Sequence, residues 1–208
     1  MPTENKSNKI ITVVLVVIIA IAAITVLYVS LPQNEENNAS TGNNEQSGNQ
    51  TESVVLTVIY GDQQTNYTFP QLENLTAFTG MGGYRTSYPS IKGQGNYTGV
   101  PVTTLVELAA GNIENYSVTV YSSDGNKTYN YSMVLGDVDL YNASNASDAT
   151  PIGNGRATMI IAYMKDGQYL NESQDGKLKT AFVNGREEII TSSDLWRKYV
   201  ISIEIVQQ

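Results

Sequence analysis

The amino-acid sequence predicts an α+β domain that is rich in β-structure, carries short helices and is preceded by one transmembrane helix. Three observations lead to this fold class. Residues 10–31 are uncharged and apolar, several later runs alternate β-branched or aromatic residues with polar ones, and two short segments combine a starting proline with helically spaced apolar residues. Alternation with a period of two is typical of strands, whereas apolar residues three or four apart indicate helices.

The first element is the run IITVVLVVIIAIAAITVLYVSL at 10–31. As a helix it spans about 33 Å, which matches a hydrocarbon core of about 30 Å. A cleaved signal peptide is the alternative, but its apolar region has only about 7 to 15 residues before a small-x-small cleavage site. Tyr28 lies near the outer end of the run, where interfacial aromatic rings are common. The sequence therefore favours a retained membrane anchor.

Charges around this run predict its orientation. Lys6 and Lys9 precede it, whereas residues 33–40 carry only acidic charge, and cytoplasmic flanks are enriched in Lys and Arg. We expect a cytoplasmic tail at 1–9 and a single-pass cell-membrane protein whose C-terminal domain is extracellular. Ten Lys and Arg against 19 Asp and Glu follow the run, so no basic surface for nucleic acid is expected.

The part beyond the anchor begins with a polar stalk. Residues 32–53 contain no large apolar side chain and cannot bury enough surface to become ordered, so the folded domain is expected at 54–208. Eleven Asn-x-Ser/Thr acceptors and the lack of cysteine predict an archaeal surface glycoprotein. The acceptors are Asn38, Asn49, Asn66, Asn74, Asn96, Asn115, Asn126, Asn130, Asn142, Asn145 and Asn171.

The first half of the domain alternates strands and short helices. Residues 54–60 and 65–69 predict a hairpin, and PQLENLTAF at 70–78 predicts a helix of one to two turns. The glycine-rich segment GMGGYRTSYPSIKGQGNYTGVP at 80–101 is expected to be a loop. PVTTLVELAAG at 101–111 is the clearest helix, since it begins with proline, carries an apolar stripe and ends in glycine.

Strand patterns dominate the second half. Residues 116–135 and 157–170 each read as a hairpin around an Asp-Gly turn, and residues 177–183 and 198–206 add two more strands. The domain should therefore contain six to nine strands with two or three short helices, which together define the α+β class.

Several kinds of chemistry are excluded by composition. The chain has no cysteine and no histidine, so a Ser-His-Asp or Cys-His hydrolase and a zinc or copper site built on those ligands are ruled out. The glycines at 80–101 match neither a phosphate-binding loop nor a dinucleotide-binding fingerprint. Asp137, Asp139 and Asp148 suggest calcium, but their spacing does not fit the twelve-residue calcium loop, and a solvated acidic edge is the better interpretation.

Two further features are open to more than one interpretation. The adjacent Glu187 and Glu188 would point to opposite faces of a strand, so we expect surface residues rather than a catalytic pair. The single tryptophan, Trp196, could line a pocket, although packing under the last strand is favoured. Fourteen tyrosines fit either a binding surface or a core of large side chains with polar tips.

Four blocks in order carry a family resemblance: YTGVPVTTLVELAAG, VTVYSSDGNKTYNYSM, MIIAYMKDGQYLNESQDGKLKTAFV and LWRKYVISIEI. They resemble the oxidoreductase molybdopterin-binding domain, the sulfite-oxidase-like family, over residues 54–206. This resemblance implies a β-dominated α+β fold. It also implies a cleft for a molybdenum pterin, with the glycine-rich segment 80–95 at its rim.

The chain departs from the family where the metal is held. Family enzymes ligate molybdenum through one cysteine upstream of the GVP block, but the segment here offers only Met81 and Ser87, which are not equivalent donors. Lys179 stands where the family has an arginine. We therefore expect no catalytic residue, no metal and no cofactor, with molybdopterin implied by the resemblance alone. Cysteine-free versions resemble short archaeal surface proteins of the family.

The leading hypothesis is a non-catalytic extracellular domain that binds a surface ligand or protein partner through the former cofactor face. The predicted face comprises Tyr84, Arg85, Tyr97, Asp124 and Trp196. For the glycine-rich segment, a loop that closes over a shrunken pocket filled by its own side chains is favoured over an open cleft rim. A molybdopterin-dependent oxidoreductase, or a subunit of a redox complex, is the alternative function, and a structural envelope module is a third possibility.

Overall fold

Two β-sheets make up most of the domain in the computed structural model, which describes residues 52–88, 90–148, 150–185 and 189–208. Strands account for 54% of the described residues and helices for 14%. The predicted α+β class is therefore wrong, and this part of the chain is a mostly β domain. The two predicted helices do form where the sequence placed them, but they are short elements between strands.

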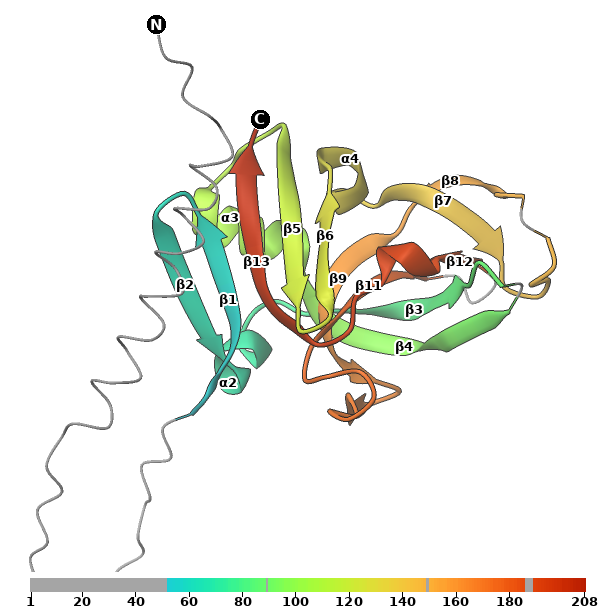
Figure 1. Cartoon of the computed structure of the whole chain (residues 1–208), viewed down its shortest axis with the longest axis horizontal. Coiled ribbons are helices and arrows are strands. Elements are labelled where there is room, and N and C mark those ends of the chain that lie inside the picture. Colours follow the sequence, from blue (N-terminus) through green and yellow to red (C-terminus); the bar gives the residue numbers. More distant parts are fainter. Residues whose placement is uncertain (1–51, 89, 149, 186–188) are drawn as a thin grey trace, which may run out of the picture. The chain divides into compact units, whose positions relative to one another are not determined.

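The first sheet has five strands in the order β2-β1-β13-β5-β6 (Figure 1). β1 and β13 pair in parallel, so the first and last strands of the domain lie side by side. All other pairs in this sheet are antiparallel. The strands are β1 (Val54–Tyr60), β2 (Gln63–Thr68), β5 (Tyr116–Ser122), β6 (Gly125–Tyr129) and β13 (Val200–Gln207).

The second sheet has eight strands, four of which close into a ring. β3 pairs with β4, β4 with β9, β9 with β11 and β11 again with β3. The ring strands are β3 (Phe78–Arg85), β4 (Ile91–Pro101), β9 (Thr158–Lys165) and β11 (Lys179–Asn184). The other strands are β7 (Asp137–Asn142), β8 (Gly153–Arg156), β10 (Gln168–Tyr169) and β12 (Ile189–Ser192).

The glycine-rich segment lies in this ring, so its assignment as a loop is wrong. β3 and β4 form a hairpin over most of its length. The glycines permit close packing rather than irregular backbone: a Cβ at Gly99 would lie 2.2 Å from the Ile161 carbonyl oxygen. Gly99 sits at a register shift between β4 and β9, and its missing side chain lets β4 close the ring.

Three α-helices and one 3₁₀-helix are found among the described residues. They are α2 (Phe69–Glu73), α3 (Val102–Ala110), α4 (Tyr131–Val134) and η1 (Ser193–Leu195). α3 confirms the clearest predicted helix, with Pro101 before its first residue and Gly111 after its last. α2, with five residues, confirms the predicted helix of one to two turns, although Phe78, the last residue of the segment 70–78, begins β3 instead.

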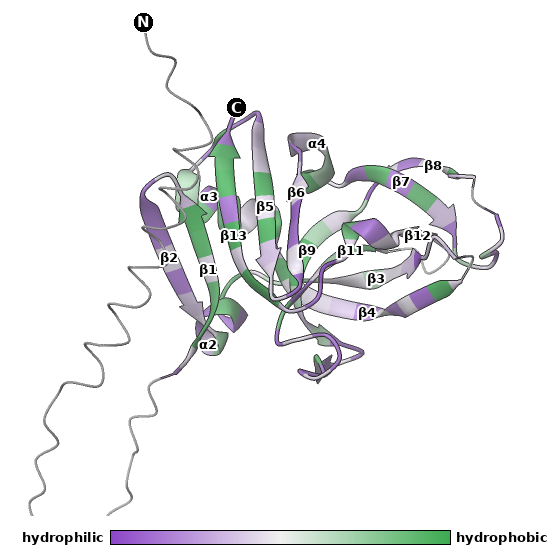
Figure 2. Cartoon of the chain, viewed as in Figure 1, coloured by the Kyte–Doolittle hydropathy of each residue, from purple (hydrophilic) through white to green (hydrophobic). Residues whose placement is uncertain are grey.

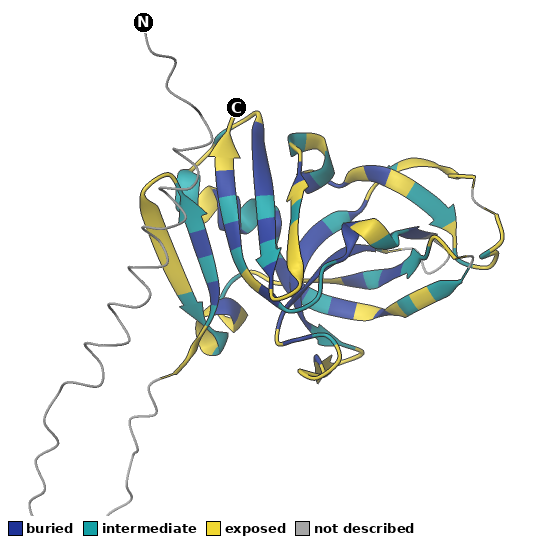
Figure 3. Cartoon of the chain, viewed as in Figure 1, coloured by how far each residue is buried: buried dark blue, intermediate teal, exposed yellow. Residues whose placement is uncertain are grey.

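The core lies on the inner faces of the strands and under α3. Figure 2 shows hydrophobic residues along β1, β13 and β5, and Figure 3 shows the same strands carrying buried positions. β9 and β11 are buried over most of their length. Continuous burial of this kind is expected for strands covered on both sides.

Several sequence-based predictions concern residues outside the described part. The cytoplasmic tail 1–9, the anchor 10–31, stalk residues 32–51 and the pair Glu187 and Glu188 all lie there. Within the described residues, no helix is long and apolar enough to cross a membrane. Nor do three or more acidic, His or Cys side chains gather there in a way that could hold a metal ion.

Candidate functional site

Three of the five predicted site residues converge on one side chain, Lys179. Tyr84 comes from β3, Tyr97 from β4 and Trp196 from the segment after η1. The Tyr84 and Tyr97 rings each lie 5.2 Å from the Trp196 ring, centroid to centroid. Lys179 is the first residue of β11. These four residues, with Asp175, are called the Lys179 cluster below.

The aromatic rings surround the ammonium group of Lys179. Its Nζ atom lies 5.4 Å from the Trp196 ring centroid, 5.7 Å from that of Tyr97 and 5.8 Å from that of Tyr84. A cation within about 6 Å of an aromatic face is attracted by the ring quadrupole. The Lys179 side chain is only 3% exposed, so water contributes little to its solvation. The three rings and one carboxylate stabilise the ammonium group in place of water.

That carboxylate belongs to Asp175, whose Oδ1 atom lies 2.9 Å from Lys179 Nζ and 3.2 Å from Lys198 Nζ. Burial alone would raise the pKa of Asp175, but the hydrogen bonds and charges of the two lysines together lower it below its ordinary value. Burial lowers the pKa of Lys179, and Asp175 opposes this shift. The pair therefore compensates two charges that would be costly alone.

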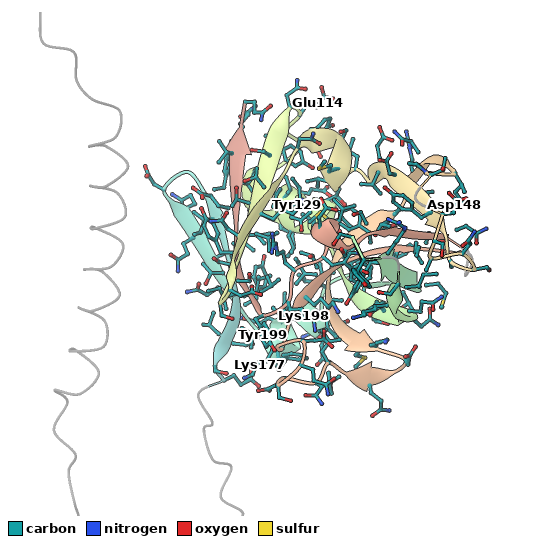
Figure 4. The ribbon with its side chains drawn as sticks, turned by 45° about the vertical axis from the view of Figure 1, so that its right-hand side comes forward. Glu114, Tyr129, Asp148, Lys177, Lys198 and Tyr199 are labelled. Carbon is teal, nitrogen blue, oxygen red and sulfur yellow. The ribbon has the colours of Figure 1, made fainter. Side chains whose placement is uncertain are left out.

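The backbone around Asp175 is fixed by the segment after Trp196. The amide of Tyr199 donates to the Asp175 carbonyl (2.8 Å), and the Tyr199 hydroxyl donates to the Ser173 carbonyl (2.9 Å). Lys198 Nζ donates to the Gln174 carbonyl (2.8 Å). Figure 4 labels Lys198 and Tyr199, the two residues that make these contacts. The fold thus positions the carboxylate of Asp175.

The polar side-chain atoms of Trp196 and Tyr97 are also paired. Trp196 Nε1 donates to Thr191 Oγ1 (2.8 Å), and the Tyr97 hydroxyl donates to the Gly93 carbonyl (2.6 Å). Burial raises the pKa of Tyr97, which keeps its hydroxyl protonated as a donor. Tyr97 and Trp196 are 1% and 7% exposed. Tyr97 and Trp196 are therefore buried and hydrogen-bonded within the fold rather than open to a ligand.

The first sheet supports the cluster from behind. Tyr129 of β6, labelled in Figure 4, donates its hydroxyl proton to the Leu195 carbonyl at 2.8 Å. Burial raises the pKa of Tyr129 to about 12. The contact fixes the residue directly before Trp196, so both sheets help to orient the indole ring.

The other two predicted site residues lie elsewhere. Arg85 follows Tyr84 in β3 but points to the opposite side, where its Nε donates to the Ala146 carbonyl (3.1 Å) and its guanidinium lies 5.9 Å from the Tyr141 ring centroid. Asp124 lies in the turn between β5 and β6 and accepts a hydrogen bond from Ser122 Oγ (2.7 Å). The predicted face is therefore divided among three places.

A second candidate region is a cavity of about 700 Å³ that sequence reasoning missed. It lies where the start of β1, helix α2 and the segment after β10 meet, and is called the Phe69 pocket below. Its lining consists of Glu52, Ser53, Val55, Phe69, Pro70, Tyr169, Leu170, Glu172 and Lys177. Lys177 is labelled in Figure 4. Nothing local in the sequence relates residues 52–55 to residues 169–177, because only the folded chain brings them together.

Comparison with family models gives no match, and comparison with curated proteins gives none either. Among solved structures, the chain is similar to the sulfane dehydrogenase SoxCD from Paracoccus pantotrophus, with a TM-score of 0.51 and 14% sequence identity. The similarity covers 74% of this chain but only 38% of the SoxCD chain. At this identity the similarity shows a shared fold.

Proposed function

We propose that this protein is a non-catalytic binding protein built on a sulfite-oxidase-like fold, in which side chains of the Lys179 cluster fill the region that holds the cofactor in enzymes of the family. One observation carries the proposal. The ammonium of Lys179 is enclosed by three aromatic rings and paired with Asp175. An enclosed and paired cation leaves no free charge for a substrate, and loss of either partner would leave a buried charge uncompensated.

The family resemblance relates the position of the Lys179 cluster to the cofactor cleft of the family. In the resemblance, the β3–β4 segment forms the rim of the cofactor cleft, and Lys179 replaces a family arginine. The similarity to SoxCD supports the same architecture. The donors present do not fit a molybdenum pterin, because the chain has no thiolate and the aromatic residues at this position pack on one another.

Binding is therefore proposed outside the cluster. Tyr97 and Trp196 are too deeply buried to contact a ligand without local unfolding, which weighs against the former cofactor face as a receptor surface. The sequence-based expectation of a ligand or protein partner is kept, with a different surface as the place of contact. Sequence alone supports the extracellular, glycosylated and membrane-anchored setting, which glycan analysis and protease accessibility on intact cells would test.

The proposal is tested by loading the protein under conditions that favour the cofactor. The full chain is produced in a host that makes molybdopterin, with SoxCD produced in parallel as the loading control. We expect molybdenum far below one atom per chain, no pterin fluorescence after denaturation, and no oxidation of sulfite. Molybdenum close to one atom per chain, together with turnover, would instead support the oxidoreductase or redox-subunit alternative.

A further inference from the structure

The geometry of the Phe69 pocket points to a ligand class, and we propose that the pocket binds a small organic cation that carries an aromatic or branched apolar group. The inference rests on the proposed function only in treating the domain as a binding domain. It adds the place of binding and the chemistry of the ligand.

One wall of the pocket is aromatic. The Phe69 ring makes edge-to-face contacts with Tyr169, at 5.2 Å between centroids, and with Tyr163, at 5.9 Å. Tyr163 is buried, whereas Tyr169 is 58% exposed and lines the pocket. A cavity of about 700 Å³ is within the usual range for small-molecule sites. The wall therefore offers apolar and cation–π contacts to a compact ligand.

The polar lining is mainly acidic. Glu52 and Glu172 line the pocket, and Lys177 is the single cation among the lining residues. Lys177 Nζ lies 3.9 Å from Glu172 Oε1, in a pair whose side chains are 46% and 70% exposed, so solvent screens this contact strongly. Outside the lining, Glu73 accepts a hydrogen bond from the Tyr169 hydroxyl at 2.6 Å. The local charge therefore attracts a cation and repels an anion.

The groups that would contact the ligand are held in place by the fold. Glu52 Oε2 accepts a hydrogen bond from Thr68 Oγ1 (3.1 Å), and the Thr68 amide donates to Gln71 Oε1 (2.8 Å) in the capping box of α2. Tyr169 is fixed on one side by Glu73 and on the other by Phe69. Preorganised walls lower the entropic cost of binding a small ligand.

Other occupants match this lining less well. Residues 32–51, which precede the pocket in the chain, contain no large apolar side chain to cover Phe69 and Tyr169. A neutral sugar could stack on Tyr169 but would leave the acidic charge uncompensated. An aryl- or alkylammonium ion uses the rings and the carboxylates together, because the rings attract cations and the carboxylates neutralise them.

A matched set of probes tests the charge requirement. Binding of 2-phenylethylammonium, 2-phenylethanol and 3-phenylpropionate to the full chain is measured by isothermal titration calorimetry, with methyl glucoside as the sugar probe. We expect the ammonium compound to bind about tenfold more tightly than the alcohol and to weaken as salt is added, with no binding of the carboxylate. Equal affinity for the three phenyl compounds, tighter binding of the sugar, or no binding of any probe would overturn the inference.

Variants locate the site. Tyr169→Ala should weaken binding of the ammonium probe about tenfold, and Glu172→Gln about threefold. Glu107→Gln, on the exposed side of α3, is the matched control and should bind as the wild type does. Unchanged affinity in Tyr169→Ala with an intact circular dichroism spectrum would place binding elsewhere. Molybdenum is measured on the same samples. Molybdenum in the chain would contradict the proposed function, whereas failure to bind the ammonium probe would contradict only this inference.

Discussion

The Lys179 cluster and the Phe69 pocket use the same kinds of side chain in opposite ways. Each combines aromatic rings, a lysine and carboxylate groups. In the cluster, the Lys179 side chain is 3% exposed and lies 2.9 Å from its carboxylate. In the pocket, Lys177 is 46% exposed and lies 3.9 Å from its carboxylate. Residue type therefore does not decide which region is structural and which is free to bind; burial and pairing decide it.

One short segment serves both regions. Residues 171–178 provide Asp175 to the cluster and Glu172 and Lys177 to the pocket. Hydrogen bonds from Lys198 and Tyr199 hold the segment against the body of the domain. The rigid cluster thereby sets the position of one side of the pocket. A change in the cluster should reach the pocket through this segment, whereas a change in the pocket should leave the cluster intact.

The strongest test of the contrast removes one aromatic ring from each region. Trp196→Ala should lower the free energy of unfolding by about 4 kcal/mol, because it empties a buried site and leaves Thr191 without its indole donor. Tyr169→Ala should cost at most about 1 kcal/mol, because that ring is mostly exposed. Urea denaturation followed by circular dichroism measures both. Similar losses in the two variants would contradict the division into a structural and a binding region.

The two lysines provide a second matched pair. Lys179→Ala should destabilise the domain by about 3 kcal/mol, because it removes the cation from three rings and leaves Asp175 half-buried with Lys198 alone. Lys177→Ala should change the stability by less than about 0.5 kcal/mol, as is usual for an exposed ion pair. The same denaturation experiment applies. A loss below about 1 kcal/mol for Lys179→Ala would mean that the enclosed ammonium contributes little to the fold.

Acid titration examines the carboxylate of the cluster. The folded-state pKa of Asp175 lies below its ordinary value of 3.8, so its ionised form stabilises the fold above pH 3.8 and this stabilisation is lost as the pH falls through the folded-state pKa. Asp175→Asn should be less stable than the wild type at pH 7 by on the order of 1 kcal/mol. The difference should shrink toward pH 3. A difference that stays constant from pH 7 to pH 3 would show that Asp175 does not act through its charge.

The sequence predicted the strands better than the closure of the sheets. Alternation and Asp-Gly turns located the β5–β6 and β9–β10 hairpins, because both signals are local. The end of the first predicted hairpin was wrong, since Tyr131–Val134 form helix α4 instead of continuing the strand. The ring of β3, β4, β9 and β11 depends on pairing between distant segments, which periodicity does not reveal. The glycines at 80–101 were interpreted as a loop because their need for close interstrand packing becomes visible only with Ile161 in place.

Three of the five predicted site residues lie together in the fold, while their role in binding stays a prediction. Tyr84, Tyr97 and Trp196 are large and stand in motif-bearing segments, and the fold brings them together. Asp175 carries no such signal, since its role requires Lys179 four residues later and Lys198 from another part of the chain. The role of Phe69 in a pocket could not be predicted, because the adjacent Pro70 indicates only the start of a helix.

The smallest expected effects concern the two predicted residues that lie outside both regions. Arg85→Ala removes one hydrogen bond to the Ala146 carbonyl and a contact with the Tyr141 ring, and should cost about 0.5 to 1 kcal/mol. Asp124→Ala loses only the hydrogen bond from Ser122 and should cost about 0.5 kcal/mol. Neither variant should alter binding of 2-phenylethylammonium, because neither side chain lines the Phe69 pocket. If Arg85→Ala instead weakened binding as strongly as Tyr169→Ala does, the ligand surface would extend to the far side of β3, and the contrast between the cluster and the pocket would have to include a third region.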